Sequence, residues 1–162
     1  MAGRAWKFKD DIDTDAIIPG RYLVINDPEG LAEHVFEGVR PEFAGEVLAG
    51  DFVVAGTNFG CDSSREHAPL GLKGAGVKAV VAKSFARIFF RNAINIGLPL
   101  FVSSDVERIR DGDSIDIDVD EGVIYNRSRG ESYRTTPLPP FLQEIVEAGG
   151  LVSYTKRKVG SL

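Results

Sequence analysis

Cysteine and histidine are scarce in this chain. Its 162 residues include one cysteine, Cys61, and two histidines, His34 and His67. A single thiol excludes an internal disulfide, and it is too few for an iron–sulfur cluster, which takes about three or four thiolates. Two histidines argue against a zinc or non-haem iron site built from this chain alone. We therefore expect no metal site on this chain.

Long apolar runs and an excess of positive charge are also missing. No apolar run approaches the roughly 18 residues that a membrane span needs, and the N-terminus lacks the layout of a signal peptide. The formal net charge of -5 argues against nucleic acid or an anionic membrane as the main partner. With 43% hydrophobic and 27% charged residues, we expect one globular, cytoplasmic domain over residues 1–162.

Strand and helix patterns alternate in the first hundred residues. A polar loop marked by glycine and proline extends to about residue 27. Hydrophobic runs predict strands at 4–9, 51–55, 77–82 and 98–102. Capping residues and glycine stops predict helices at 28–37, closed by Gly38, and from Ser84 to residue 96, closed by Gly97. Short parallel strands with crossover helices are implied.

The last third of the chain has a different pattern. Residues 114–119 alternate strictly and connect through 120–122 to a second apolar run at 123–125, which predicts an antiparallel hairpin. A helix is expected from the Pro139-Pro140 pair to about residue 148, followed by a final strand at 151–156. The fold class is therefore α/β with mixed parallel and antiparallel strands.

A polar motif, GTNFGCDSSREHA, follows the strand at 51–55 and occupies residues 56–68. Ser63 and Glu66 have the spacing of a capping box, which predicts a helix that begins at or near Ser63. Free backbone N–H groups at a helix start, two hydroxyls and the planar guanidinium of Arg65 suit a carboxylate or phosphate ligand. The alternative is that Ser63 only caps the helix and Arg65 makes a surface ion pair.

Four carboxylates lie within residues 10–15, which in isolation suggests calcium or magnesium binding. The segment lacks the glycine at the sixth position and the glutamate at the twelfth position of an EF-hand loop, so its spacing does not favour a metal site.

The motif at 56–68 resembles the signature of the swivelling domain of the aconitase superfamily. Residues 10–23, DDIDTDAIIPGRYL, are similar to the N-terminal segment of that family, and residues 83–92 with 97–99 are similar to its third landmark. The resemblance implies a three-layer swivelling β/β/α domain. In isopropylmalate dehydratases and some homoaconitases this domain is a separate small subunit. Its large partner subunit carries a [4Fe-4S] cluster, so this chain alone is expected to be inactive.

The resemblance also implies the roles of the motif residues. Ser63 is the catalytic base, and Ser64 and Arg65 bind a substrate carboxylate. Asp62 departs from the family pattern, which has glycine there; aspartate tolerates a left-handed backbone, but its charge opposes carboxylate binding unless it pairs with Arg65 or with a cation of the large subunit. Glu66 is expected to complete the capping box, and Thr14 and Asp15 to order the turn at a structural, substrate-edge loop.

The two histidines are not expected to take part in catalysis. A histidine in a first helical turn is usually structural, so His67 is expected to be structural rather than catalytic, and His34 is expected on a surface or in packing.

The substrate loop of the family falls on Tyr22, Leu23, Val24 and Ile25, which are apolar here. In homoaconitase-like relatives an arginine stands at the position of Val24, so the resemblance favours a hydro-lyase that interconverts 2- and 3-isopropylmalate in leucine biosynthesis. The alternatives are a homoaconitase or a citramalate or dimethylmalate dehydratase small subunit, or a carboxylate-binding module without catalysis. The four apolar residues are also consistent with simple packing in the core or at a subunit contact.

Overall fold

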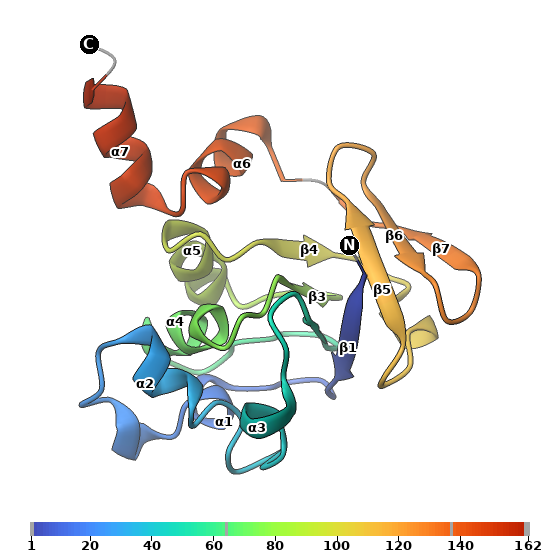
Figure 1. Cartoon of the computed structure of the whole chain (residues 1–162), viewed down its shortest axis with the longest axis horizontal. Coiled ribbons are helices and arrows are strands. Elements are labelled where there is room, and N and C mark those ends of the chain that lie inside the picture. Colours follow the sequence, from blue (N-terminus) through green and yellow to red (C-terminus); the bar gives the residue numbers. More distant parts are fainter. Residues whose placement is uncertain (1, 64, 137, 161–162) are drawn as a thin grey trace.

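A seven-stranded sheet with the strand order β4-β3-β2-β1-β5-β6-β7 organises the molecule (Figure 1). The computed structural model describes residues 2–63, 65–136 and 138–160. Four strands form the parallel part of the sheet: β1 (Gly3–Lys7), β2 (Phe52–Val54), β3 (Ala79–Ala82) and β4 (Leu100–Val102). Every residue of β2 and β3 is buried, as expected for parallel strands that are covered on both faces. The four predicted strands of the first hundred residues are thus confirmed.

The antiparallel part continues the same sheet beyond β1. It contains β5 (Ser114–Asp118), β6 (Val123–Asn126) and β7 (Glu131–Arg134). Strand β5 pairs antiparallel with β1 and with β6, which confirms the predicted hairpin. Strand β7 was not predicted, because Tyr133 is its only buried residue and its four positions show no apolar run.

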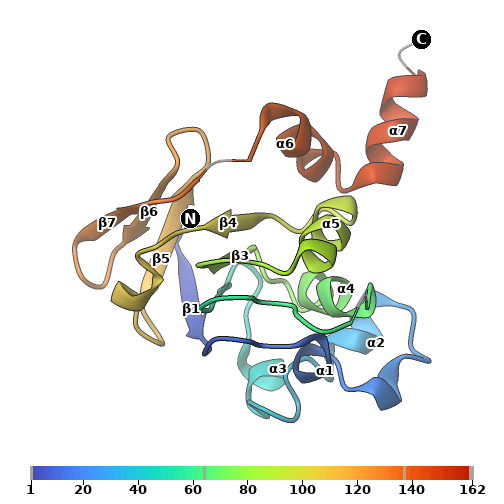
Figure 2. The same ribbon diagram turned by 180° about the vertical axis from the view of Figure 1, so that it is seen from behind.

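Helices cover one face of the parallel strands (Figure 2). The bounds of the helices are α1 (Thr14–Ile17), η1 (Gly20–Tyr22), α2 (Pro28–Ala32), α3 (Phe43–Glu46), α4 (His67–Gly74), α5 (Arg87–Asn95), η2 (Val106–Arg108), α6 (Pro140–Glu147) and α7 (Leu151–Gly160). The core on this face contains Trp6, Val53 and Val80. The opposite core contains Phe52 and Val81 from the parallel strands together with residues of β5, β6 and β7. Helices, parallel strands and antiparallel strands therefore form three layers.

Two predicted helices are shorter than expected. Helix α2 ends at Ala32 rather than near residue 37, because Phe36 adopts a positive φ of 59° and its N–H bonds to the carbonyl of Ile17 at 2.9 Å. Helix α5 begins at Arg87 rather than at Ser84. The Ser84 hydroxyl accepts a hydrogen bond from the Asn58 N–H at 2.8 Å instead of capping the helix.

The expected strand at 151–156 is wrong. These residues belong to α7, which follows α6 after a turn at Gly149 and Gly150. All residues of α7 are exposed except Tyr154, which is half-buried. A strand needs a neighbouring strand for its backbone hydrogen bonds, whereas a helix satisfies them internally, so an exposed terminal segment without a sheet edge beside it favours the helix. Within the described part of the chain, no helix is long and apolar enough to cross a membrane.

Candidate functional site

The motif loop that follows β2 lies against the acidic segment that follows β1. The Gly60 N–H bonds to the carbonyl of Ile12 at 2.7 Å, and the Thr14 N–H bonds to the carbonyl of Cys61 at 3.1 Å. Asp13 and Cys61 form a parallel β-bridge. Because β1 and β2 are neighbouring parallel strands, their C-terminal ends bring these two loops together at one edge of the sheet.

The predicted capping box does not form. Helix α4 begins at His67, and within the described residues its N-cap, Glu66, makes no side-chain capping bond. The chain turns at Asp62, whose φ of 81° is in the left-handed region, so Ser63 precedes the helix by four residues. Asp62 thus adopts the left-handed backbone that aspartate was expected to tolerate, whereas the expected helix start at Ser63 is wrong. His67 is the half-buried first residue of the helix.

Ser63 makes its side-chain contact with the acidic segment. Its Oγ lies 2.7 Å from the Oγ1 of Thr14. Ser63 is exposed, whereas Thr14 is buried with only 1% of its surface accessible. The predicted base therefore presents one side to solvent and is held from the other side by a buried hydroxyl. Ser64, the second predicted hydroxyl of the motif, lies outside the described residues.

Arg65 is fixed by the same segment. Its Nη1 donates to Oδ1 of Asp15 at 2.9 Å and to the carbonyl of Ile18 at 3.2 Å. In the described residues these acceptors occupy only Nη1, which leaves the Nε and Nη2 donors of the guanidinium for a ligand. The carboxylate that pairs with Arg65 is thus Asp15 and not Asp62. The hydrogen bond from Arg65 is the main cause that lowers the pKa of Asp15, followed by the bond from the Gly20 N–H.

Cys61 is a poor candidate for covalent chemistry. Its side chain is buried, and burial is the main cause that raises the pKa of the thiol above its ordinary value. The nearby carboxylates of Asp62, Asp13 and Asp11 raise the pKa further. The thiol therefore stays protonated at neutral pH and acts as a small packing residue.

The apolar loop at residues 22–25 divides into buried and exposed positions. Tyr22 and Ile25 are half-buried and pack against the core, while Leu23 is half-buried and Val24 is 85% exposed. The Tyr22 ring stacks on His34 with 3.7 Å between centroids, which confirms a packing role for that histidine. Gly20, two residues before this loop, lies next to the guanidinium of Arg65. A Cβ built at Gly20 would lie 3.6 Å from Nη2 of Arg65.

The four carboxylates of residues 10–15 bind different groups. Asp10 accepts from the Thr57 N–H at 2.7 Å, Asp11 from Asn58 at 3.3 Å, Asp13 from the Ala16 N–H at 2.7 Å, and Asp15 from Arg65. They organise the two loops rather than converge on one point. In the part of the chain that the structure describes, no three His, Cys, Asp or Glu side chains are grouped to hold a metal ion.

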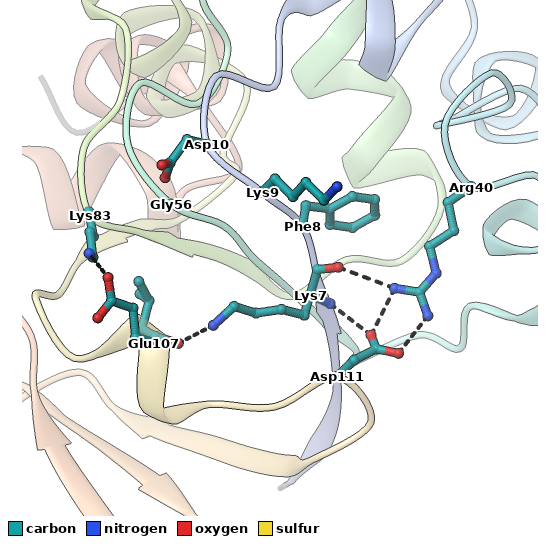
Figure 3. A pocket seen from close by; sticks show the side chains of 10 residues that line it. Lys7, Phe8, Lys9, Asp10, Arg40, Gly56, Lys83, Glu107 and Asp111 are labelled. Atoms are coloured by element: carbon teal, nitrogen blue, oxygen red, sulfur yellow. Dashed lines mark hydrogen bonds and ion pairs between the residues drawn. The ribbon is translucent and has the colours of Figure 1, made fainter.

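A cavity of about 870 Å³ opens elsewhere, between β1 and the loop before β5 (Figure 3). Several of its charged side chains are held by hydrogen bonds or ion pairs. Lys7 donates to the carbonyl of Ile109 at 2.8 Å, and Arg40 forms a two-pronged pair with Asp111 at 2.7 and 2.8 Å. None of the predicted site residues in the described chain lines this cavity.

Sequence reasoning assigned Thr14 and Asp15 only to turn formation. It missed that they contact the side chains of Ser63 and Arg65, which lie 49 and 50 residues later in the chain. No local spacing reveals such a contact. The usable signal was that both segments follow strands predicted to be parallel, which places their loops at the same sheet edge.

Comparison with known proteins agrees with this architecture. Residues 47–104 match the family model of the aconitase C-terminal domain. The 3-isopropylmalate dehydratase small subunit 1 of Archaeoglobus fulgidus is 66% identical over 154 residues, which cover 95% of this chain and 96% of that protein. The 3-isopropylmalate dehydratase small subunit of Methanosarcina mazei is 62% identical over 159 residues, which cover 98% of each chain.

A solved structure has the same fold. The crystal structure of 3-isopropylmalate dehydratase from Methanocaldococcus jannaschii superposes with a TM-score of 0.94 at 48% identity, and the match covers 99% of this chain and 96% of that one. The expected aconitase-type domain with mixed parallel and antiparallel strands is thereby confirmed.

Proposed function

Because this chain belongs to the family of 3-isopropylmalate dehydratase small subunits, we propose that it provides the base and the carboxylate-binding groups of a two-subunit hydro-lyase. The enzyme interconverts 2- and 3-isopropylmalate through dehydration and rehydration. The observation that carries the proposal is the placement of Ser63 and Arg65, both held by α1 and the residues that directly follow it at one edge of the sheet. The proposal includes a cytoplasmic location and a role in leucine biosynthesis.

In this proposal Ser63 moves the proton. Its ionised Oγ takes a proton from the carbon beside a substrate carboxylate, so the C–H bond breaks and an O–H bond forms. The electron pair becomes the carbon–carbon double bond as hydroxide leaves. Readdition of water at the neighbouring carbon gives the other isomer, with Ser63 returning the proton. The [4Fe-4S] cluster, when bound to the large subunit, supplies a Lewis acid for the leaving hydroxyl.

Arg65 binds the carboxylate in this proposal. The free Nε and Nη2 donors of the guanidinium match the two oxygens of a substrate carboxylate, while Nη1 keeps the group in place through Asp15 and Ile18. Ser64 is proposed to add a hydroxyl donor to the same carboxylate.

Substrate choice is proposed to depend on residues 22–25. Val24 is 85% exposed and lies four residues after Gly20, which is next to the Arg65 guanidinium, so we propose that it offers an apolar surface to a substituent of the substrate. The neighbouring Arg21 forms an ion pair with Glu37. A third carboxylate placed against Val24 would lose water without gaining a partner, at a free-energy cost of several kcal/mol. An isopropyl group suits this surface, and the smaller methyl group of citramalate loses only about 1–3 kcal/mol.

The proposal is tested by reconstitution. The purified chain is mixed under anaerobic conditions with a large subunit that carries a reconstituted cluster, and the absorbance of isopropylmaleate is followed, with homoaconitate and citraconate in parallel. We expect turnover of isopropylmaleate only in the mixture, and a gain of homoaconitate turnover in Val24→Arg. Turnover of homoaconitate by the unaltered chain contradicts the substrate assignment. No turnover of any substrate favours a carboxylate-binding module.

The base is tested by Ser63→Ala in the same mixture. General base catalysis contributes about 10²- to 10⁴-fold, so kcat should fall by that factor while the two subunits still associate on size-exclusion chromatography. Turnover that equals that of the unaltered chain removes Ser63 from the mechanism.

A further inference from the structure

The hydrogen bond between Thr14 and Ser63 joins a buried hydroxyl to an exposed one. The two oxygens are 2.7 Å apart, and Thr14 is 1% exposed. Ser63 faces solvent and can donate its own proton to water. Thr14 has no such choice, because Ser63 Oγ is the only partner of its hydroxyl within residues 2–63, 65–136 and 138–160.

This asymmetry sets the direction of the hydrogen bond. A buried O–H without an acceptor is costly, whereas an exposed O–H finds water at little cost. The Thr14 hydroxyl therefore donates and Ser63 Oγ accepts. That direction is also the one that an ionised Ser63 requires, because an alkoxide has no proton to give and only accepts hydrogen bonds.

The backbone keeps Thr14 in place relative to the motif loop. The Thr14 N–H donates to the carbonyl of Cys61 at 3.1 Å, two residues before Ser63, and the Thr14 carbonyl accepts from the Ile18 N–H at 2.9 Å. Asp13 caps the same helix turn through the Ala16 N–H. The donor is thus fixed before any substrate binds, which is the condition for stabilising a charge without reorganisation.

We propose that Thr14 is the positioning residue of the dehydratase base, and that its buried hydroxyl orients Ser63 Oγ and stabilises it in the ionised form. The inference rests on the proposed role of Ser63. It adds a second residue, from the acidic segment, on which proton removal depends although it does not touch the substrate.

The test compares Thr14→Val and Thr14→Ser in the reconstituted enzyme. Valine has a similar shape and no donor, and a hydrogen bond to a charged group is strong enough that kcat should fall about 10- to 100-fold with little change in KM. The pH at which kcat reaches half of its maximum should move upward, because a less stabilised alkoxide forms only at higher pH. Thr14→Ser restores the donor and should return kcat to within about threefold.

Thr135→Val is the matched control. Thr135 is also buried, and its hydroxyl donates to the carbonyl of Val102 at 2.8 Å, far along the chain from the motif loop. This variant should lose stability without moving the pH profile. If Thr14→Val fails to fold, the smaller Thr14→Ala removes the same donor and is measured in the same way.

The outcomes separate this inference from the proposed function. An unchanged kcat in Thr14→Val, or a decrease that is equal at every pH and is not reversed by Thr14→Ser, overturns the positioning role while Ser63→Ala still shows its large loss of kcat. Full activity in Ser63→Ala would show that Ser63 is not the base, which would overturn the proposed role of Ser63 itself.

Discussion

Arg65 divides its donors between the protein and solvent. Nη1 is bound by Asp15 and Ile18, and the side chain keeps an exposed fraction of 24%. A lysine at this position has a single point of charge and no planar fork, so it could not contact Asp15 and a substrate carboxylate in the same two-pronged way.

We therefore predict that Arg65→Lys weakens substrate binding more than it slows proton transfer. KM for isopropylmaleate should rise by about tenfold or more, because a hydrogen bond to a charged group contributes about 1.5–3 kcal/mol. Steady-state kinetics of the reconstituted enzyme measure both constants. A lower kcat with an unchanged KM would assign Arg65 to the transition state rather than to binding.

At the scale of elements, the motif loop is fitted closely to α5. Gly60 has a φ of 84°, and a Cβ there would lie 2.2 Å from the ring of Phe89, which is buried in the core. The loop can approach the helix this closely only because residue 60 has no side chain. This contact holds the loop that carries Ser63 against the helical layer.

Gly60→Ala should destabilise the protein by about 1–3 kcal/mol from overpacking, in addition to the strain of a positive φ. The matched control is Gly112→Ala, where φ is 88° and a Cβ would have no other atom within 4 Å. That variant carries only the strain, about 1–2 kcal/mol. Urea unfolding measures the free energy of unfolding of both variants. Equal losses in the two variants would mean that the Phe89 contact adds nothing.

A second contact between elements joins the turn before α3 to the loop before β5. Arg40 pairs with Asp111 at two points, and the Lys7 N–H donates to the same carboxylate at 2.9 Å (Figure 3). The hydrogen bond from Arg40 is the main cause that lowers the pKa of Asp111. A carboxyl group with a lower pKa in the folded than in the unfolded state stabilises the protein above its unfolded-state pKa.

Asp111→Asn should therefore lower the free energy of unfolding near neutral pH and have little effect in acid. The Asp111 side chain is 45% exposed, so solvent screening limits the loss to about 0.2–1 kcal/mol. The difference between the two proteins should shrink as the pH falls through the folded-state pKa of Asp111. Urea unfolding at neutral pH and in acid measures it, and a difference that is constant with pH contradicts the ion-pair explanation.

Strong local signals were sufficient for most of the fold. The buried runs around Val53 and Val80 and the alternation around Ile115 predicted the strands, because burial of one or two faces leaves a direct pattern in the sequence. Capping signals were less reliable. Ser63 and Ser84 both have the residue type of a helix cap, yet each bonds to a distant segment instead.

The candidate site could also be predicted only in part from local patterns. Ser63 and Arg65 are identified from one motif, but their contacts with α1 depend on how β1 and β2 align their ends. A tertiary hydrogen bond across 49 residues has no local signature and competes successfully with the local capping box. The helix α7 was missed for a related reason, since its exposed residues carry no burial pattern.

At the scale of the whole molecule, the site is open on one side. Ser63 and Val24 face solvent at the domain edge, and the chain has one buried cysteine, so the proposed enzyme needs a second chain to enclose the substrate and to hold the cluster. Each of the two subunits then contributes groups that the other subunit lacks. Activity should follow the concentration of the complex and not that of either chain.

We predict that activity saturates when the small and large subunits are present in equal amounts. A fixed amount of large subunit with a reconstituted cluster is titrated with this chain, and the initial rate of isopropylmaleate consumption is measured at concentrations well above the dissociation constant. Ser63→Ala serves as the control, because it should compete for the large subunit and reduce the rate in proportion to its share. Saturation at another ratio, or failure of Ser63→Ala to compete, would contradict an enzyme assembled from equal numbers of the two subunits.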